Sequence, residues 1–216
     1  ICRNFARSEG GFFSYQKLTE YVHRIGIKTT SLRQQMQLGI KPVYLYYSSD
    51  EIVLAETLGI DDAWLDRTGA ALQRLFADLG DHVILRGIRD IWYQQLPLLP
   101  AAQPWTPLLL QYILKFYGGQ LGAKTIQAMS SQRYDTLHCM VVSLESEVQT
   151  FPDAVVSFLV DSEIPQRTFR GEELRRLLVN GQLIAGNELI NNMPKALGGD
   201  TRFAWNATGE TVKVLV

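Results

Sequence analysis

Apolar residues in the first fifty positions recur with the spacing of amphipathic helices and then with that of a strand. Over residues 14–26 they fall three or four positions apart, and Ser14 stands where its side chain can cap the first turn. A capping-box pattern opens a second helix over residues 31–39. The segment VYLYY at 43–47 then predicts a strand, because it is rich in aromatic and β-branched residues.

A second stretch of the chain repeats part of this pattern. HRIGIKTTSLRQ (23–34) and ETLGIDDAWLDR (56–67) share an Ile or Leu, a Gly-Ile pair and, farther on, a Leu. The apolar spacing predicts a helix over 50–58, a tight turn and a longer helix over 61–79. HVIL at 82–85 predicts a short strand.

This second stretch resembles the helix-turn-helix of bacterial and archaeal regulators. In that motif a small residue lies where two helices approach, a glycine turns the chain, and an apolar residue opens the turn. An apolar residue and often an arginine follow in the second helix. The matching residues in this chain are Ala55, Gly59, Ile60, Leu65 and Arg67. The resemblance covers about 20 residues per copy and identifies a superfamily rather than one family.

Prolines punctuate the second half of the chain. Four of the eight lie within residues 96–107, which predicts an extended joint. Thr106 and Pro107 then begin an apolar helix that we expect to end at Gly118-Gly119. Residues 135–146 fit either a helix or a strand. The remaining expected elements are a helix over 151–163, a helix-turn-helix over 169–197 and a hairpin around 207–210.

These patterns predict a mostly helical α+β chain of tandem helix-turn-helix or winged-helix-like units with short β-hairpins. We expect a basic unit at 1–48, an acidic unit at 49–95, the joint at 96–107 and a helical domain at 108–216. The last domain is expected to end in a winged-helix-like unit, because helix, turn, helix and hairpin follow in that order. The chain opens at Ile1 rather than Met, so we expect an excised fragment.

Charge is unevenly distributed, although the whole chain has a net charge of −1. Residues 1–48 hold seven basic and two acidic residues, whereas residues 49–95 hold four basic and nine acidic ones. Cations, hydroxyls and backbone N–H groups at the start of a recognition helix meet phosphate oxygens. Carboxylates on the second helix of the acidic unit would repel a duplex, so that unit is expected to contact protein. The predicted nucleic-acid-binding residues are Lys28, Thr29, Thr30, Ser31, Arg33 and Lys41.

Three functional hypotheses follow from these patterns. The first is a non-enzymatic, DNA-associated regulatory or adaptor module. The second is a protein-interaction scaffold within a larger assembly, without nucleic-acid binding. The third is a nucleotide-binding enzyme, because GGQLGAKT (118–125) partly matches a phosphate-binding loop. Ala123 stands where that loop needs a glycine, so we expect Lys124 to have no catalytic role.

No other pattern marks a catalytic or metal site. Cys2 and Cys139 are too few and too far apart for a zinc site or a disulfide framework, and the three histidines lack metal-ligand spacing. We therefore expect no cofactor. The most apolar stretch, 96–121, is interrupted by polar residues and prolines, so we expect no membrane segment and a cytoplasmic location.

Overall fold

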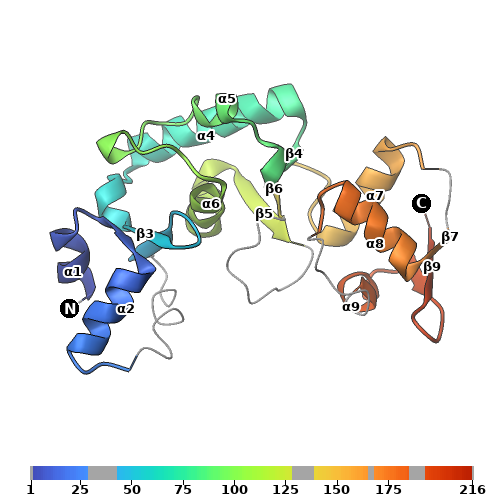
Figure 1. Cartoon of the computed structure of the whole chain (residues 1–216). Coiled ribbons are helices and arrows are strands. Elements are labelled where there is room, and N and C mark those ends of the chain that lie inside the picture. Colours follow the sequence, from blue (N-terminus) through green and yellow to red (C-terminus); the bar gives the residue numbers. More distant parts are fainter. Residues whose placement is uncertain (1, 29–42, 128–138, 165–167, 185–192, 216) are drawn as a thin grey trace. The chain divides into compact units, whose positions relative to one another are not determined.

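The chain folds as an α+β protein with about 50% helix and small antiparallel three-stranded sheets, which confirms the predicted class (Figure 1). The computed structural model describes residues 2–28, 43–127, 139–164, 168–184 and 193–215. Its contacts define two compact units. The first comprises Ile1–Asp78 and Arg89–Lys124, and the second comprises Leu79–Ile88 and Thr125–Val216.

The first sheet lies near the N-terminus. Its strand β1 (Phe12–Ser14) stands between helices α1 (Cys2–Ser8) and α2 (Tyr15–Arg24). Strands β2 (Tyr44–Tyr46) and β3 (Glu51–Leu54) complete it, and the central strand β3 pairs antiparallel with both neighbours. The Ser14 side chain accepts the Lys17 backbone N–H at 3.0 Å, so it caps α2 as the sequence predicts. Strand β2 likewise falls within the predicted strand.

The predicted helix over 50–58 is wrong. Its first half is strand β3, and Ala55–Leu58 form a short 3-10 helix, η1, that ends at Gly59 with φ +59°. Residues 52–54 are all buried, because the central strand of this small sheet is covered on both faces and shows no polar alternation. A short apolar run of this kind fits a helix or a strand equally well. The helix-turn-helix implied by the resemblance therefore lacks its first α-helix in this copy.

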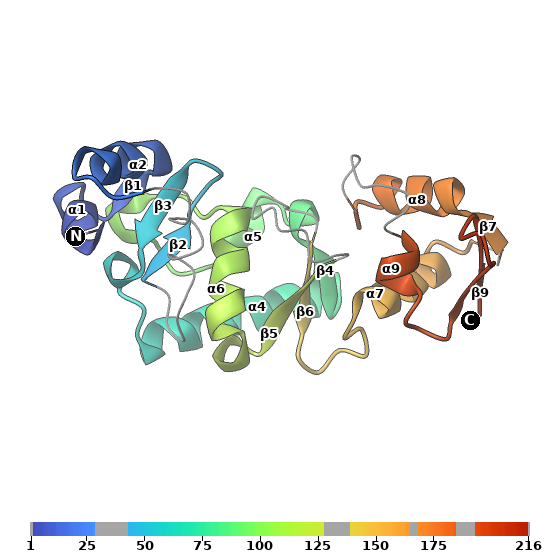
Figure 2. The same cartoon turned by 90° about the horizontal axis from the view of Figure 1, so that it is seen from below.

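Two long helices, α4 (Asp62–Leu79) and α6 (Pro107–Leu121), follow the first sheet (Figure 2). The Thr106 side chain accepts the Leu109 backbone N–H at 3.1 Å, so α6 starts where the sequence predicts. It does not end at Gly118-Gly119 but continues to Leu121 and stops at Gly122, whose φ is +66°. Between the two helices lie β4 (His82–Ile84), η2 (Leu85–Gly87), α5 (Asp90–Tyr93) and η3 (Pro100–Ala102).

The proline-rich segment 96–107 packs within the first unit. Trp105 stacks on Trp64 of α4, with ring centroids 5.7 Å apart. The Tyr47 hydroxyl donates to the Pro104 carbonyl at 2.7 Å, which ties the segment to the first sheet. The division of the chain at this segment stays a prediction.

Two further sheets follow. In the second, β6 (Cys139–Ser143) lies between β4 and β5 (Ala123–Gln127), so the described part of the ambiguous segment 135–146 contains a strand. The predicted helix over 151–163 and the predicted hairpin around 207–210 are both confirmed. The elements around the third sheet are α7 (Phe151–Asp161), β7 (Thr168–Arg170), α8 (Gly171–Asn180), α9 (Met193–Leu197), β8 (Phe203–Trp205) and β9 (Thr211–Val214).

All three sheets share one order of elements. A helix (α1, α4 or α7) precedes the first strand, one or more helical segments follow it, and two further strands come last, among the described residues. In each sheet the last strand lies in the middle: β1-β3-β2, β4-β6-β5 and β7-β9-β8. We call these three sets of elements the first, middle and last repeats. They do not follow the sequence similarity between 23–34 and 56–67: the described part of the first copy includes the end of α2, whereas the second copy lies on η1 and α4.

Arg202 ties the start of α7 to the segment before β8. One guanidinium nitrogen lies 2.5 Å from Asp153 Oδ1 and 2.6 Å from Asp200 Oδ2. Asp153 also accepts the backbone N–H groups of Gln149 and Thr150, and with Thr150 it forms the capping box of α7. Burial would raise the pKa of Asp153, but its hydrogen bonds to Arg202, Thr150 and the backbone lower it to about 2.

We predict that Arg202→Ala lowers the free energy of unfolding at pH 7 by ~1 kcal/mol, a value reduced because both partners are partly exposed. The folded-state pKa of Asp153 is lowered, so the stabilisation is complete above the unfolded value near pH 4 and is lost as the pH falls toward about 2. Urea unfolding at pH 7 and at about pH 2 measures the free energy of unfolding of wild type and variant. The difference between wild type and variant should shrink at low pH, and Arg176→Ala, at an exposed ion pair on α8, is the control. A difference that does not change with pH would contradict the assignment.

Candidate functional site

One of the six predicted nucleic-acid-binding residues, Lys28, lies at the end of the first described segment. Lys28 is exposed and lies four residues beyond the last residue of α2, after a turn at Gly26 with φ +80°. The other five predicted residues, Thr29, Thr30, Ser31, Arg33 and Lys41, lie outside the described residues. In sequence they stand between α2 and the β2–β3 hairpin.

Part of the positive charge of residues 1–48 is neutralised within the protein. Arg7 Nε lies 2.6 Å from Glu56 Oε1, and Arg3 approaches the same carboxylate at 3.8 Å. The hydrogen bond from Arg7 is the main cause that lowers the pKa of Glu56. Lys17 pairs with Glu9 at 3.0 Å. The charge that remains for a phosphate partner is therefore concentrated toward the end of α2 and beyond it.

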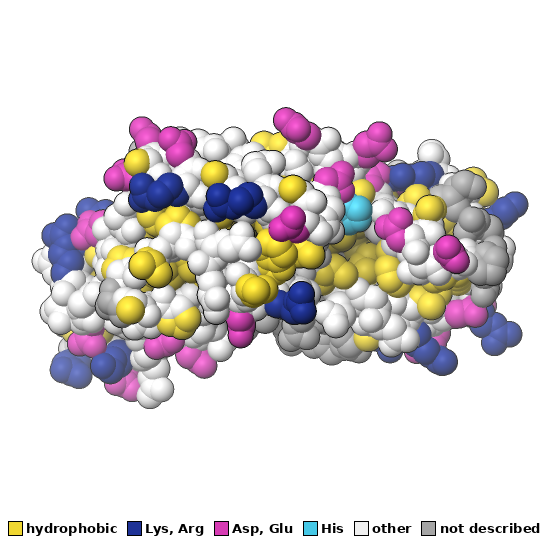
Figure 3. Space-filling view, turned by 90° about the horizontal axis from the view of Figure 1, so that it is seen from above, with side chains coloured by type: hydrophobic (Ala, Val, Ile, Leu, Met, Phe, Trp, Pro, Cys, Tyr) yellow, Lys and Arg dark blue, Asp and Glu magenta, His cyan; other side chains and the backbone are white. Residues whose placement is uncertain are grey.

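Two basic residues of this region, Arg24 and Lys28, are exposed and make no ion pair within 4.0 Å to another described residue. They continue in sequence into the predicted Arg33 and Lys41. Elsewhere the charges are mixed: the described Lys, Arg, Asp and Glu side chains on the face in Figure 3 are interspersed and form no single basic band. A local basic segment is thus a better candidate for a nucleic-acid-binding site than the wider surface of the protein.

The acidic helix α4 has a different character. The Asp61 side chain accepts the Trp64 backbone N–H at 2.7 Å and so caps the helix. Asp62 and Asp66 are exposed, whereas the buried side of the helix includes Trp64, Leu65, Leu72, Leu75 and Phe76. The carboxylates therefore form a solvent-facing side of a helix whose other side belongs to the core of the first unit.

The segment that partly matches a phosphate-binding loop is the end of a helix followed by a strand. Gly118 and Gly119 lie inside α6, and Lys124 lies in β5. A phosphate loop needs a strand that leads into a helix N-terminus, where backbone N–H groups and the helix dipole attract anions. Here the carbonyl end of α6 leads into the strand, so the order is reversed. Close packing explains the glycine at position 118 instead, because a Cβ there would lie 2.4 Å from the Ala123 carbonyl oxygen.

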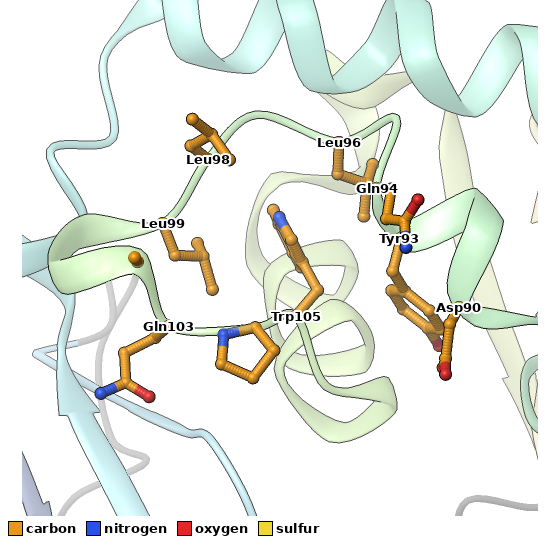
Figure 4. Close-up of a pocket in the computed structure, with 10 residues that line it drawn as sticks. Asp90, Tyr93, Gln94, Leu96, Leu98, Leu99, Gln103 and Trp105 are labelled. Atoms are coloured by element: carbon orange, nitrogen blue, oxygen red, sulfur yellow. The ribbon is translucent and has the colours of Figure 1, made fainter.

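A hollow that the sequence did not predict lies along the proline-rich segment. It has a volume of about 350 Å³ and is lined by residues 90–105, chiefly apolar ones. Figure 4 shows Leu99 and Gln103 on one side of Trp105, and Asp90, Tyr93 and Gln94 on the other. Leu98 is 90% exposed at this hollow, whereas Leu96 and Leu99 are buried. The sequence feature at this place is a run of leucines between prolines, which fix the backbone.

No protein-family model, no curated protein sequence and no solved structure matches this chain.

The described part of the chain holds neither a membrane-spanning helix nor a cluster of metal ligands. None of its helices is long and apolar enough to cross a bilayer. No group of three or more His, Cys, Asp or Glu side chains there is placed to hold a metal ion.

We predict opposite effects for alanine at the two adjacent glycines of α6. Gly118→Ala should destabilise the fold by about 2 kcal/mol, because its Cβ meets a backbone carbonyl that cannot move as a side chain could. Gly119→Ala should be neutral or stabilising by up to ~1 kcal/mol, since nothing lies within 4 Å of its Cβ and alanine favours helix. Urea unfolding of both variants checks this, and equal effects would contradict the helix-to-strand geometry.

Proposed function

We propose that this chain is a non-enzymatic, DNA-associated regulatory or adaptor module built from winged-helix-like repeats. The observation that carries the proposal is the order of elements, repeated three times with the same strand order in each sheet. Helices followed by a two-stranded hairpin are the elements of a winged helix, and a fold of that kind presents a helix to the major groove. The proposal rests on this order and on the placement of charge.

The first repeat is the one proposed to contact nucleic acid. Its candidate residues, Lys28, Thr29, Thr30, Ser31, Arg33 and Lys41, stand between α2 and the hairpin, where a recognition helix begins in a helix-turn-helix. Arg3, Arg7 and Lys17 are paired with Glu56 and Glu9, so the charge left for phosphates lies at Arg24 and in this segment. Lysines and arginines there would position the chain on the backbone of the duplex.

The helix before the hairpin of the middle repeat is not available to contact nucleic acid. The helix before its hairpin is α6, in which Leu108 to Leu114 are all buried, including Gln111. Removing this helix from the core to reach a groove would expose several large apolar side chains, each worth about 1.5–3 kcal/mol. We therefore assign α6 a packing role and leave contact with nucleic acid to the first repeat.

We predict that Lys28→Glu with Arg33→Glu weakens binding of a mixed-sequence duplex by at least about tenfold, because two phosphate contacts become repulsive. Fluorescence anisotropy at low salt measures the affinity. The affinity of wild type should fall steeply with salt. The slope of log affinity against log salt should be smaller for the double variant, by the amount that about two phosphate contacts contribute.

The matched control is Lys195→Glu with Lys213→Glu, which makes the same charge change in the last repeat. A general electrostatic attraction would be weakened equally by both double variants, whereas the proposal expects the control to stay close to wild type. No binding of wild type at tens of micromolar, roughly where non-specific affinity is measurable, would refute DNA contact by this chain.

A protein-interaction scaffold is the second candidate function, favoured by the hollow of Figure 4. An exposed leucine beside Trp105 is the kind of apolar feature that protein interfaces cover. Leu98→Asp should abolish the capture of specific partners from a cell extract. Ile91→Asp, which places the same charge on an exposed residue that does not line the hollow, should leave capture unchanged. Equal loss in both variants would refute a role for the hollow.

A further inference from the structure

A second hollow lies entirely within the second unit, between a sheet and a helix. Its volume is about 540 Å³, within the usual range for small-molecule sites. Strands β4 and β6 form one wall, where Ile84 pairs with Met140, and helix α7 forms another. The lining residues that a ligand would meet include His82, Met140, Phe158, Asp161 and Leu183.

Most of this lining is apolar, and its polar groups gather at one place. Phe158, Met140 and Leu183 offer an aromatic ring, a thioether and a branched side chain to a ligand. The ionisable side chains among the lining residues are His82 and Asp161. A ligand that fills the hollow therefore needs an apolar body and a single polar head.

A chain of hydrogen bonds links the polar groups. Asp81 Oδ1 lies 2.6 Å from His82 Nδ1, and the hydrogen bond is the main cause that lowers the pKa of Asp81. The other ring nitrogen, Nε2, lies 3.3 Å from Ser157 Oγ, and that hydroxyl donates to Asp161 Oδ2 at 3.1 Å. Because a carboxylate only accepts, the Asp81 contact places a proton on Nδ1 and leaves Nε2 of the neutral ring as an acceptor.

This series of hydrogen-bonded side chains has more acceptors than hydrogens. Ser157 carries one hydroxyl hydrogen, and both His82 Nε2 and Asp161 Oδ2 are within its reach. When the hydrogen goes to Asp161, the imidazole nitrogen faces an oxygen without a hydrogen between them. Asp161 is exposed to solvent, so a ligand that brings N–H donors would replace water at its carboxylate.

The electrostatic setting also selects a cation. Asp161 is the last residue of α7, so the carboxylate stands at the carbonyl end of an 11-residue helix, where positive charge is favoured. Asp81 adds a second carboxylate behind the imidazole. Among the lining residues there is no Lys or Arg to balance them. An anionic head would meet the Asp161 carboxylate and, among the lining residues, no Lys or Arg.

We propose that this hollow binds a small amphipathic amine. The apolar part of the ligand lies against Phe158, Met140 and Leu183. Its ammonium group donates to Asp161 and to the hydrogen-bonded side chains beside it. The site lies in the second unit and uses none of the residues proposed to contact nucleic acid, so the two assignments stand or fall separately. In a regulatory module such a site would receive an effector.

The test uses three ligands with one apolar body and different heads: 1-naphthylmethylamine, 1-naphthylmethanol and 1-naphthoate. Calorimetric titration of the full chain at pH 7 should show the amine binding at least about tenfold more tightly than the alcohol, and the carboxylate most weakly, because only the amine complements the acceptors. Equal affinities, the reverse order, or no saturable binding of the amine by about 5 mM would overturn the proposal.

Two variants place the binding in this hollow. Asp161→Asn should reduce the affinity for the amine by about fivefold or more and leave the affinity for the alcohol unchanged, since only the charged head loses a partner. Glu145→Gln makes the same charge change at an exposed residue of the same unit that does not line the hollow, and it should have no effect. An amine affinity that is the same in Asp161→Asn as in wild type, or that falls equally in both variants, would show that the amine binds elsewhere or through net charge alone.

Discussion

The burial of helix α6 is the constraint on which the first unit depends. Its residues from Leu108 to Leu114 are withdrawn from water, so the helix needs partners around its whole circumference. The first sheet supplies one of them, where Tyr46 packs on Tyr112 with ring centroids 5.1 Å apart and the Thr106 hydroxyl donates to the Tyr47 carbonyl. Helix α4 supplies another, and the approach is close enough that a Cβ at Gly69 would touch the backbone of Leu121. The first repeat and the helices of the middle repeat therefore form one core.

This use of α6 separates the repeats by role. The helix before the hairpin is a packing element in the middle repeat, whereas the corresponding part of the first repeat carries the basic residues proposed to meet phosphates. The acidic α4 adds to this division, because its buried side joins the core and its carboxylates stay in solvent. In the second unit, the hollow beside α7 provides a different kind of surface, apolar with one acidic end. The proposals thus assign packing, nucleic-acid contact and ligand binding to different positions of one repeated arrangement.

The sequence predicted elements where a local signal is strong and failed where tertiary packing decides. Ser14 and Thr106 cap their helices as expected, because capping needs only the side chain and the next turn. The sequence pattern predicts a helix where β3 lies, because Ile52, Val53 and Leu54 are all buried and show no alternation. The end of α6 was placed too early, since Gly118 is required by a close approach to Ala123 rather than by a turn. The hollow beside α7 is lined by residues distant in sequence, and no local pattern marks it.

The most direct test of this account is amide hydrogen exchange across α6 in the full chain. If the helix is the core of the first unit, its amides exchange only through global unfolding of that unit and are among the slowest of the described residues. They should then share one opening free energy with the buried strand β3. Rapid exchange along α6, while β3 stays protected, would show that the helix opens independently, and it would contradict the packing role assigned to it.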